Sequence, residues 1–231
     1  MDAVEISNGY SWDRDFPPVY NHTSVSYLKR CPGFDAAKHG NLRAALFVAN
    51  ISVKPQRIEE LRARYPAAIL LPVGSKNRLP EAFARRIGLK VHLGVREVHT
   101  LTRKELCAME RLLHKPKFHG SILKGENYIL VDDIVTQGGS VAALRQFVLS
   151  EGGSVAAVAA LAYSAGSGVI APVPERVRQL CERFDCSRID AILRSYYIAD
   201  DIWDMTNSQI KYLLRFSSAE RLVKKIEEFV R

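Results

Sequence analysis

Tyr128–Ser140 reads YILVDDIVTQGGS, and this stretch decides the expected fold. An apolar run, Tyr128–Val131, predicts a buried strand that ends at two adjacent acids, Asp132 and Asp133. A short turn follows, and then Gly139–Ser150 has the spacing of an amphipathic helix. A strand, a glycine-containing turn and a helix N-terminus together predict a phosphate site, because backbone N–H groups and the helix dipole both favour an anion.

The turn supplies the residues expected to hold the phosphate. They are Thr136, Gln137, Gly138, Gly139 and Ser140. The glycines let the backbone approach closely, and the two hydroxyls add donors. Asp132 and Asp133 would repel a phosphate, so they need vicinal hydroxyls or a hydrated Mg²⁺ as partner. This order of acids and turn predicts a ribose 5-phosphate. No lysine follows the glycines, as a Walker A loop requires, and the G-x-G-x-x-G spacing is absent.

Strands and helices alternate on both sides of this stretch. Strands are predicted at Ala67–Val73, Lys90–Val95 and Ser154–Tyr163, and helices at Leu79–Ile87, Thr102–Leu113 and Gly139–Ser150. Two short helical patterns precede them between Asn41 and Tyr65. The alternation predicts an α/β fold with a doubly wound, mostly parallel sheet flanked by helices. Ligands would bind at the carboxyl ends of its strands.

The two ends of the chain have different patterns. Turn-forming residues predict an irregular N-terminal arm over 1–45, followed by the α/β core over 46–165. A mainly helical subdomain, 166–231, is expected to cover the ligand-binding edge as a hood. It contains a predicted helix at Val173–Phe184 and a segment compatible with a strand at Arg188–Leu193. Ile202–Arg231 is expected to be helical in two pieces, one starting at the capping box Thr206–Gln209.

Composition indicates a globular chain of 231 residues, 47% hydrophobic and 25% charged. No apolar run approaches the roughly 18 residues of a membrane span, and the N-terminus lacks signal-peptide regions, so a cytoplasmic location without membrane contact is expected. Between Lys76 and His119, eleven Lys or Arg and four Glu carry +7 of the net +8 charge. That stretch suits nucleic acid or a small polyanion. The spacing of Cys31, Cys107, Cys181 and Cys186 predicts no metal site, and reduced thiols are the favoured interpretation.

The segment VDDIVTQGGS resembles the phosphoribosyl pyrophosphate (PRPP) signature of type I phosphoribosyltransferases. The resemblance implies that Asp132 and Asp133 are catalytic residues that face the ribose hydroxyls and contact Mg²⁺ indirectly, through water. It implies that Thr136–Ser140 hold the 5′-phosphate. Gln137 departs from the pattern, because the family usually has a small residue there.

Two further sites follow from the resemblance. A pyrophosphate-binding loop is expected after the first core strand, with Gly74, Ser75, Lys76 and Arg78 as its residues. A mobile flap is expected within Arg96–Lys124, with cations to close over the diphosphate: Arg103, Lys104, Lys115 and Lys117. The alternative for this second stretch is a packed amphipathic helix at Thr102–Leu113.

The resemblance implies an enzyme, a glycosyltransferase of nucleotide metabolism. A nitrogen nucleophile would attack C1 of the ribose of PRPP, with Mg²⁺ as cofactor, and pyrophosphate would leave. The acceptor base is unidentified, because residues 164–170 lack the lysine and Val-Asp of the purine-salvage pattern. A homodimer is compatible with the fold, and the C-terminal helices could dock a partner. The alternative function is a non-catalytic PRPP or nucleotide sensor that binds nucleic acid through its basic surface.

Overall fold

The computed structural model describes residues 12, 16–74, 76–98, 106–164 and 168–230. The main sheet consists of four parallel strands in the order β1-β6-β5-β2. The strands are β1 (Tyr20–Thr23), β2 (Ile69–Pro72), β5 (Asn127–Val135) and β6 (Ser154–Tyr163). The central strands β5 and β6 are almost wholly buried, as expected of apolar runs that are covered on both faces. The predicted α/β class with a mostly parallel sheet is confirmed.

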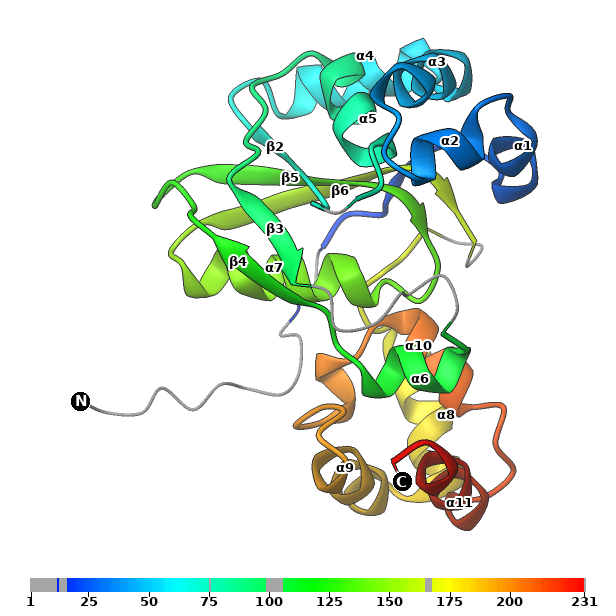
Figure 1. Ribbon diagram of the computed structural model, residues 1–231. Helices are drawn as coiled ribbons and strands as arrows, with labels where there is room; N and C mark the ends of the chain where they lie inside the picture. The colour runs from blue at the N-terminus through cyan, green and yellow to red at the C-terminus, as the bar shows by residue number, and fades with distance from the viewer. Residues whose placement is uncertain (1–11, 13–15, 75, 99–105, 165–167, 231) are drawn as a thin grey trace.

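Helices cover both faces of the main sheet (Figure 1). One face carries α1 (Val25–Arg30), α2 (Phe34–Lys38), α3 (Leu42–Ser52), α4 (Pro55–Arg64) and α5 (Leu79–Ile87), and the other carries α7 (Gly139–Ser150). Alternate residues of β5 serve the two cores. Ile129 and Val131 pack with Phe83 of α5, whereas Leu130 packs with Leu144 of α7. The sheet is therefore doubly wound, as the alternation of elements predicts.

The N-terminal segment differs from the predicted irregular arm. Tyr20–Thr23 forms the edge strand β1, with Tyr20 opposite Ala159 of β6. Two polar residues of this segment cap helices: the side chain of Ser24 accepts from the backbone N–H of Tyr27, and Asn41 caps α3 in the same way. Four residues are too few for a strand pattern to be recognised in the sequence. The pairing with β6, which makes this segment a strand, is non-local.

A two-stranded antiparallel sheet connects α5 to β5. Its strands are β3 (Val95–Val98) and β4 (Lys117–Gly120), with α6 (Ala108–Leu113) between them in the chain. The strand predicted at Lys90–Val95 is wrong: Val91 forms a single bridge with Leu70, and Val95 is the first residue of β3, which continues to Val98. The helix predicted at Thr102–Leu113 begins at Ala108 in the described residues, and 102–105 lie outside them.

A helical lobe follows the sheet, and Figure 1 shows it below α7. We use this name for α6 together with α8 (Pro174–Phe184), α9 (Cys186–Ser195), the 3₁₀ helix η1 (Ile202–Asp204), α10 (Asn207–Leu213) and α11 (Ala219–Val230). Met109 and Leu112 of α6 are buried in the same core as Leu180 of α8 and Leu222 of α11. In the described part of the chain, no helix combines the length and the apolar character that crossing a bilayer requires.

Two predictions for the helical lobe have opposite outcomes. The capping box is confirmed: the Thr206 hydroxyl accepts from the backbone N–H of Gln209, whose side chain accepts from the N–H of Thr206. The strand considered at Arg188–Leu193 is wrong, because this segment lies within α9. Ile189 and Leu193 are both buried and four residues apart, which is helical spacing.

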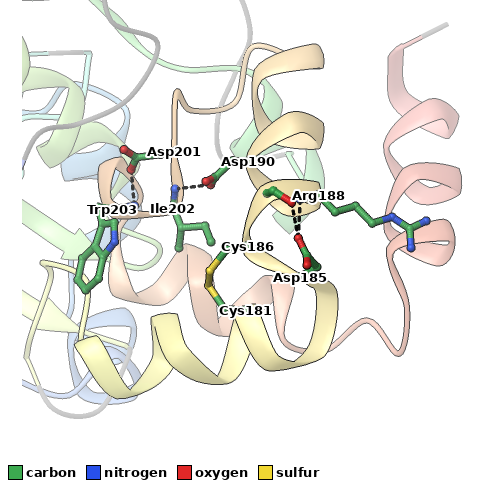
Figure 2. The surroundings of a disulfide bond; sticks show 9 residues. Cys181, Asp185, Cys186, Arg188, Asp190, Asp201, Ile202 and Trp203 are labelled. Carbon is green, nitrogen blue, oxygen red and sulfur yellow. Dashed lines mark hydrogen bonds between the residues drawn. A yellow bond between two sulfur atoms is a disulfide. The ribbon is translucent and has the colours of Figure 1, made fainter.

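Cys181 and Cys186 form a disulfide, which corrects the prediction of reduced thiols (Figure 2). Asp185, with a φ of 65°, ends α8 and caps α9 by accepting from the N–H of Arg188. The chain reverses at this residue, so the two Cα atoms lie 4.4 Å apart. The backbone turn that creates this proximity has no glycine to mark it in the sequence.

We expect Cys186→Ser to lower the free energy of unfolding by about 2 kcal/mol, the chain-entropy value for so short a loop. Denaturant unfolding under oxidising conditions measures the change. Cys107→Ser, at an exposed free thiol, is the control and should not lower stability, because Cys107 is the N-cap of α6 and serine is a preferred N-cap residue. With a reductant, wild type and Cys186→Ser should unfold alike; a wild type that is unaffected by reductant would contradict the disulfide's contribution.

Candidate functional site

The candidate site lies where β5 ends and α7 begins. A small cavity of about 40 Å³ is lined there by Asp132, by Ile134–Val141 and by Arg111 of α6. The structure therefore brings Asp132 and all five predicted phosphate-binding residues, Thr136–Ser140, to one cavity. Arg111 was not predicted from the sequence as a site residue. Its only signal was a polar position on a helix whose Met109 and Leu112 are apolar.

Gly138 lies where the turn meets the helical lobe. Its φ is +78°, and it occupies the N-cap position of α7. A Cβ atom at this residue would lie 2.9 Å from Cδ1 of Ile170, so any other residue would have to displace that side chain and also adopt a positive φ. The Thr206 hydroxyl of the helical lobe donates to the carbonyl of Gln137. The lobe thus fixes the conformation of the turn directly.

The two acids lie inside β5 rather than after it, because the strand continues to Val135. Both are buried, with exposed fractions of 8% for Asp132 and 3% for Asp133. The backbone N–H of Asp133 donates to Oδ1 of Asp132 over 2.8 Å. Burial, and then the neighbouring Asp133 carboxylate, raises the pKa of Asp132 well above its ordinary value, and Lys38 opposes this rise.

Lys38 is a site residue that the sequence did not reveal. Its Nζ lies 2.8 Å from Oδ2 of Asp133, and α2 carries it on the face of the sheet opposite α7. Asp132 lines the cavity at the start of α7, whereas Asp133 contacts Lys38. The acids therefore project to different sides, as neighbouring strand residues do. No signal in the sequence pointed to Lys38, since its segment was assigned to the irregular arm.

We expect Lys38→Met to lower the free energy of unfolding by about 2 kcal/mol, because it leaves the buried Asp133 carboxylate without its cation. The expected loss is below the roughly 3–5 kcal/mol of a fully buried pair, since the Lys38 side chain is 25% exposed. Denaturant unfolding at pH 7 measures it. Adding Asp133→Asn to this variant should restore part of the stability. A double variant that is no more stable than Lys38→Met would refute the pairing argument.

The predicted pyrophosphate loop follows β2. Gly74 is required there, because a Cβ atom would lie 2.4 Å from the carbonyl oxygen of Val95 in β3. Lys76 is exposed, and Ser75 lies outside the described residues. The N–H of Arg78 donates to the carbonyl of Ala37 at 3.1 Å, so α2 packs against this loop.

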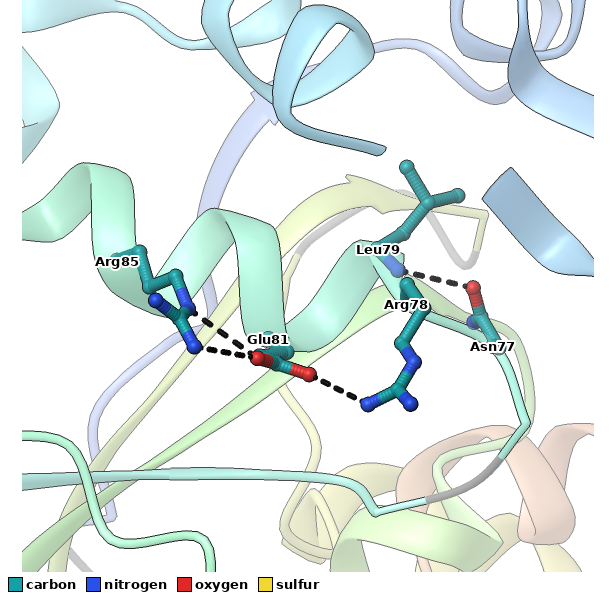
Figure 3. Close-up of polar contacts among 5 residues, drawn as sticks. All are labelled: Asn77, Arg78, Leu79, Glu81 and Arg85. Atoms are coloured by element: carbon teal, nitrogen blue, oxygen red, sulfur yellow. Dashed lines mark hydrogen bonds and ion pairs between the residues drawn. The ribbon is translucent and has the colours of Figure 1, made fainter. Parts of the chain in front are cut away.

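Arg78 is already engaged by an acid of α5 (Figure 3). It pairs with Glu81 at 2.8 Å, and Arg85 binds the same carboxylate. Burial raises the pKa of Glu81, but the hydrogen bonds from Arg85 and Arg78 outweigh burial and leave the pKa lowered. The charge of Arg78 is therefore partly neutralised, and Lys76 is the better placed cation of this loop.

Of the predicted flap cations that the structure describes, neither Lys115 nor Lys117 lines the cavity. Lys115 is half-buried in the helical lobe, where burial lowers its pKa to about 8 against the opposing effect of Asp200 and Asp204. Lys117 is exposed on β4. Arg103 and Lys104 lie outside the described residues. The packed-helix alternative describes Ala108–Leu113, whose apolar residues join the core of the helical lobe.

The acid pair can serve Mg²⁺ only in part. Among the described residues, no group of three or more His, Cys, Asp or Glu side chains is placed to hold a metal ion. Mg²⁺ commonly keeps several waters and binds one or two carboxylates together with substrate phosphates. Asp132 lines the cavity and Asp133 is engaged with Lys38, so these residues fit an ion that arrives with a diphosphate and do not fit an all-protein metal cage.

No family model matches the chain. Protein TraN of Escherichia coli is 28% identical over 145 residues, which cover 58% of this chain and 32% of TraN. An uncharacterised protein of Haemophilus influenzae is 27% identical over 149 residues, 60% of this chain and 33% of that protein. The chain thus spans about a third of the length of each of these curated relatives.

Similar solved structures include an adenine phosphoribosyltransferase, 20% identical, with a TM-score of 0.36 over 60% of this chain and 74% of that chain. The adenine phosphoribosyltransferase of Saccharomyces cerevisiae is 18% identical, with a TM-score of 0.35 over 59% and 73% of the two chains. A purine phosphoribosyltransferase of Pyrococcus horikoshii is 17% identical, with a TM-score of 0.32 over 52% and 71%. Likeness at this level establishes neither fold nor function.

Proposed function

We propose that the protein is a phosphoribosyltransferase, which uses PRPP with Mg²⁺ to ribosylate a nucleobase or related nitrogen nucleophile and releases pyrophosphate. The observation that carries this proposal is the cavity that Asp132 shares with Thr136–Ser140. A carboxylate and a phosphate-binding turn within one small cavity match the two ends of a ribose 5-phosphate. The signature resemblance of VDDIVTQGGS supports the same substrate.

The residues suggest how such a substrate would be held. The N-terminus of α7 and the hydroxyls of Thr136 and Ser140 would bind the 5′-phosphate. Asp132 would accept hydrogen bonds from ribose hydroxyls, and Asp133 would support it from the neighbouring position. When bound with the diphosphate, Mg²⁺ would neutralise part of the charge on the leaving group. Lys76 would add positive charge on that side.

The mechanism follows from positioning and electrostatics. As the nucleophile's nitrogen bonds to C1 of the ribose, the C1–O bond breaks and its electron pair leaves with pyrophosphate. Positive charge develops on the ribose ring, beside the carboxylates. Rate enhancement would come from holding the two reactants in line and stabilising both charges. No histidine is required as a general base in this scheme.

Calorimetric titration of the whole chain with PRPP, with and without Mg²⁺, tests the proposal. We expect binding that Mg²⁺ strengthens, and pyrophosphate release with at least one member of a panel of nitrogen bases. A wild-type chain that binds no PRPP in the presence of Mg²⁺ would rule the proposal out. Unchanged PRPP affinity in the double variant Asp132→Asn/Asp133→Asn would also contradict it.

A ligand sensor is the second candidate, favoured by the +7 charge between Lys76 and His119. A sensor would bind PRPP but would release no pyrophosphate with any base. It would bind RNA or DNA instead, with an affinity that falls steeply with salt and changes when PRPP is added. The two assays together separate the candidates.

A further inference from the structure

A second cavity adjoins the phosphate-binding turn, on the side of the helical lobe. Its volume is about 200 Å³, and it shares Arg111, Thr136 and Gln137 with the first cavity. The remaining wall comes from α6, from α10 and the residues after it, and from Ser164 at the end of β6. Pockets for drug-sized ligands usually measure roughly 300–1,000 Å³, so this cavity suits a single small ring.

Among the described residues, three cations and no carboxylate line this cavity. They are Arg111 of α6, Lys211 of α10 and Arg215, which follows α10. No carboxylate in the described part of the chain forms an ion pair with any of them. Other cations of the helical lobe are paired, for example Arg178 with Glu175 and Lys225 with Glu228. Unpaired like charges around a small cavity repel one another, and a bound anion would relieve that repulsion.

The aromatic wall of the cavity suits a planar ligand. The half-buried ring of Tyr212 lines it, and the guanidinium carbon of Arg215 lies 5.9 Å from the centre of this ring. Phe216 supports the ring from the edge, at 5.5 Å between centroids. Aromatic side chains prefer offset-stacked or edge-to-face contacts with another ring.

Gln137 offers a buried acceptor at the junction of the two cavities. Its Nε2 donates to the carbonyl of Ala108 at 3.2 Å, which fixes the orientation of the amide because a carbonyl can only accept. Its Oε1 is buried and has no hydrogen-bond partner among the residues that the structure describes. A buried acceptor without a partner is costly, and a ligand N–H would satisfy it. Gln137 is also the residue that departs from the family signature.

The sheet order places this cavity on one side of the ribose site. β5 lies between β2 and β6. The expected pyrophosphate loop follows β2, whereas Ser164 of the second cavity follows β6. In an in-line displacement at C1, the nucleophile enters opposite the leaving group. The second cavity therefore lies where the nucleophile would enter.

We infer that the second cavity binds the acceptor and that this acceptor is a small planar nitrogen ring that carries an anionic group. Arg111, Lys211 and Arg215 bind the anionic group, the ring lies against Tyr212, and Gln137 accepts from a ring N–H. In the reaction, the ring nitrogen bonds to C1 as pyrophosphate leaves, and any proton on that nitrogen passes to solvent water. This inference rests on the proposed function and names its substrate class.

Two pairs of rings, each with an anionic and a neutral member, test the inference. Pyridine-3-carboxylate is compared with pyridine-3-carboxamide, and uracil-6-carboxylate with uracil, by calorimetry on the whole chain with ribose 5-phosphate and Mg²⁺ present. At least one anionic ring should bind about tenfold more tightly than its neutral partner, the factor that one charge-assisted hydrogen bond supplies. Lys211→Gln/Arg215→Gln should abolish this preference and leave PRPP affinity unchanged. Lys225→Gln, at a cation paired with Glu228, is the matched control and should keep it.

The outcomes separate this inference from the proposed function. If PRPP binds but neutral rings bind as tightly as anionic ones, the inference is wrong and the proposed function stands. If the double variant keeps the anion preference, the inference is also wrong. If anionic rings are preferred but PRPP does not bind, the ligand class of the cavity is supported and the proposed function fails. Salt-sensitive oligonucleotide binding that the double variant loses, without any ring preference, would replace the inference with a nucleic-acid surface.

Discussion

Asp132→Asn should lower the rate of pyrophosphate release on the order of 10²-fold or more, the loss expected when a group that positions or stabilises the reacting sugar is removed. Asp132 lines the cavity at the start of α7, so the variant loses the carboxylate that would accept from the ribose hydroxyls. Asp133→Asn should have a smaller effect, because Asp133 contacts Lys38. Single-turnover and steady-state pyrophosphate release with the best acceptor measure both.

Asp132→Asn should also leave the fold at least as stable as wild type at neutral pH. Burial raises the pKa of Asp132 in the folded chain, so the folded state holds the proton more tightly than the unfolded state does. Stability from this group is therefore fully present below the unfolded pKa, near 4, and is lost as the pH rises toward the folded pKa. An asparagine does not titrate. Any gain in stability should be present at pH 7 and should vanish near pH 4.

Denaturant unfolding at the two pH values checks this prediction. Glu151→Gln, at an exposed carboxylate that follows the far end of α7, is the control and should change neither stability nor activity. An Asp132→Asn variant that is less stable than wild type at pH 7 would show that the carboxylate supports the fold. The loss of activity could then not be attributed to a lost contact with the substrate.

Local sequence patterns were sufficient to predict the helices and strands that are buried in the core. Leu79–Ile87 and Gly139–Ser150 are helices with the predicted bounds, and Ser154–Tyr163 is the predicted strand. In each, the apolar spacing lies within the element, and the glycine or proline that marks an end lies in the element or directly beside it. The strand β1 could not be recognised in this way, because a four-residue edge strand depends on its partner β6.

The candidate site shows the same limit. Thr136–Ser140 and Asp132 are contiguous or nearly so in the chain, and the sequence is enough to group them. Lys38 and Arg111 reach the same region from α2 and α6, 95 residues before Asp133 in the case of Lys38. Such contacts depend on how the layers pack, and no residue spacing encodes them. The Cys181–Cys186 bond likewise depends on a backbone reversal at Asp185.

Gly138→Ala should lower the free energy of unfolding by about 3 kcal/mol and weaken PRPP binding by more than tenfold. Two effects add. A φ of +78° costs a residue with a side chain roughly 1–2 kcal/mol, and forcing a methyl group into a packed site costs about 1–3 kcal/mol more. The new Cβ would lie 2.9 Å from Cδ1 of Ile170. Relief of this clash must displace either the Ile170 side chain or the turn at Gly138, whose neighbour Gln137 accepts from Thr206.

Gly125→Ala measures the backbone cost without the steric clash, so the comparison with Gly138→Ala gives the cost of the clash. Gly125 has nearly the same φ, +76°, but an added Cβ would meet nothing within 4 Å. It lies before β5, at the end of the strand opposite the phosphate-binding turn. We therefore expect Gly125→Ala to cost only the backbone part, about 1–2 kcal/mol, and to leave PRPP affinity unchanged. Denaturant unfolding and calorimetry on both variants give the comparison. Equal losses of stability would show that the Ile170 side chain yields easily, and its contact with Gly138 would then not be what holds this turn in place.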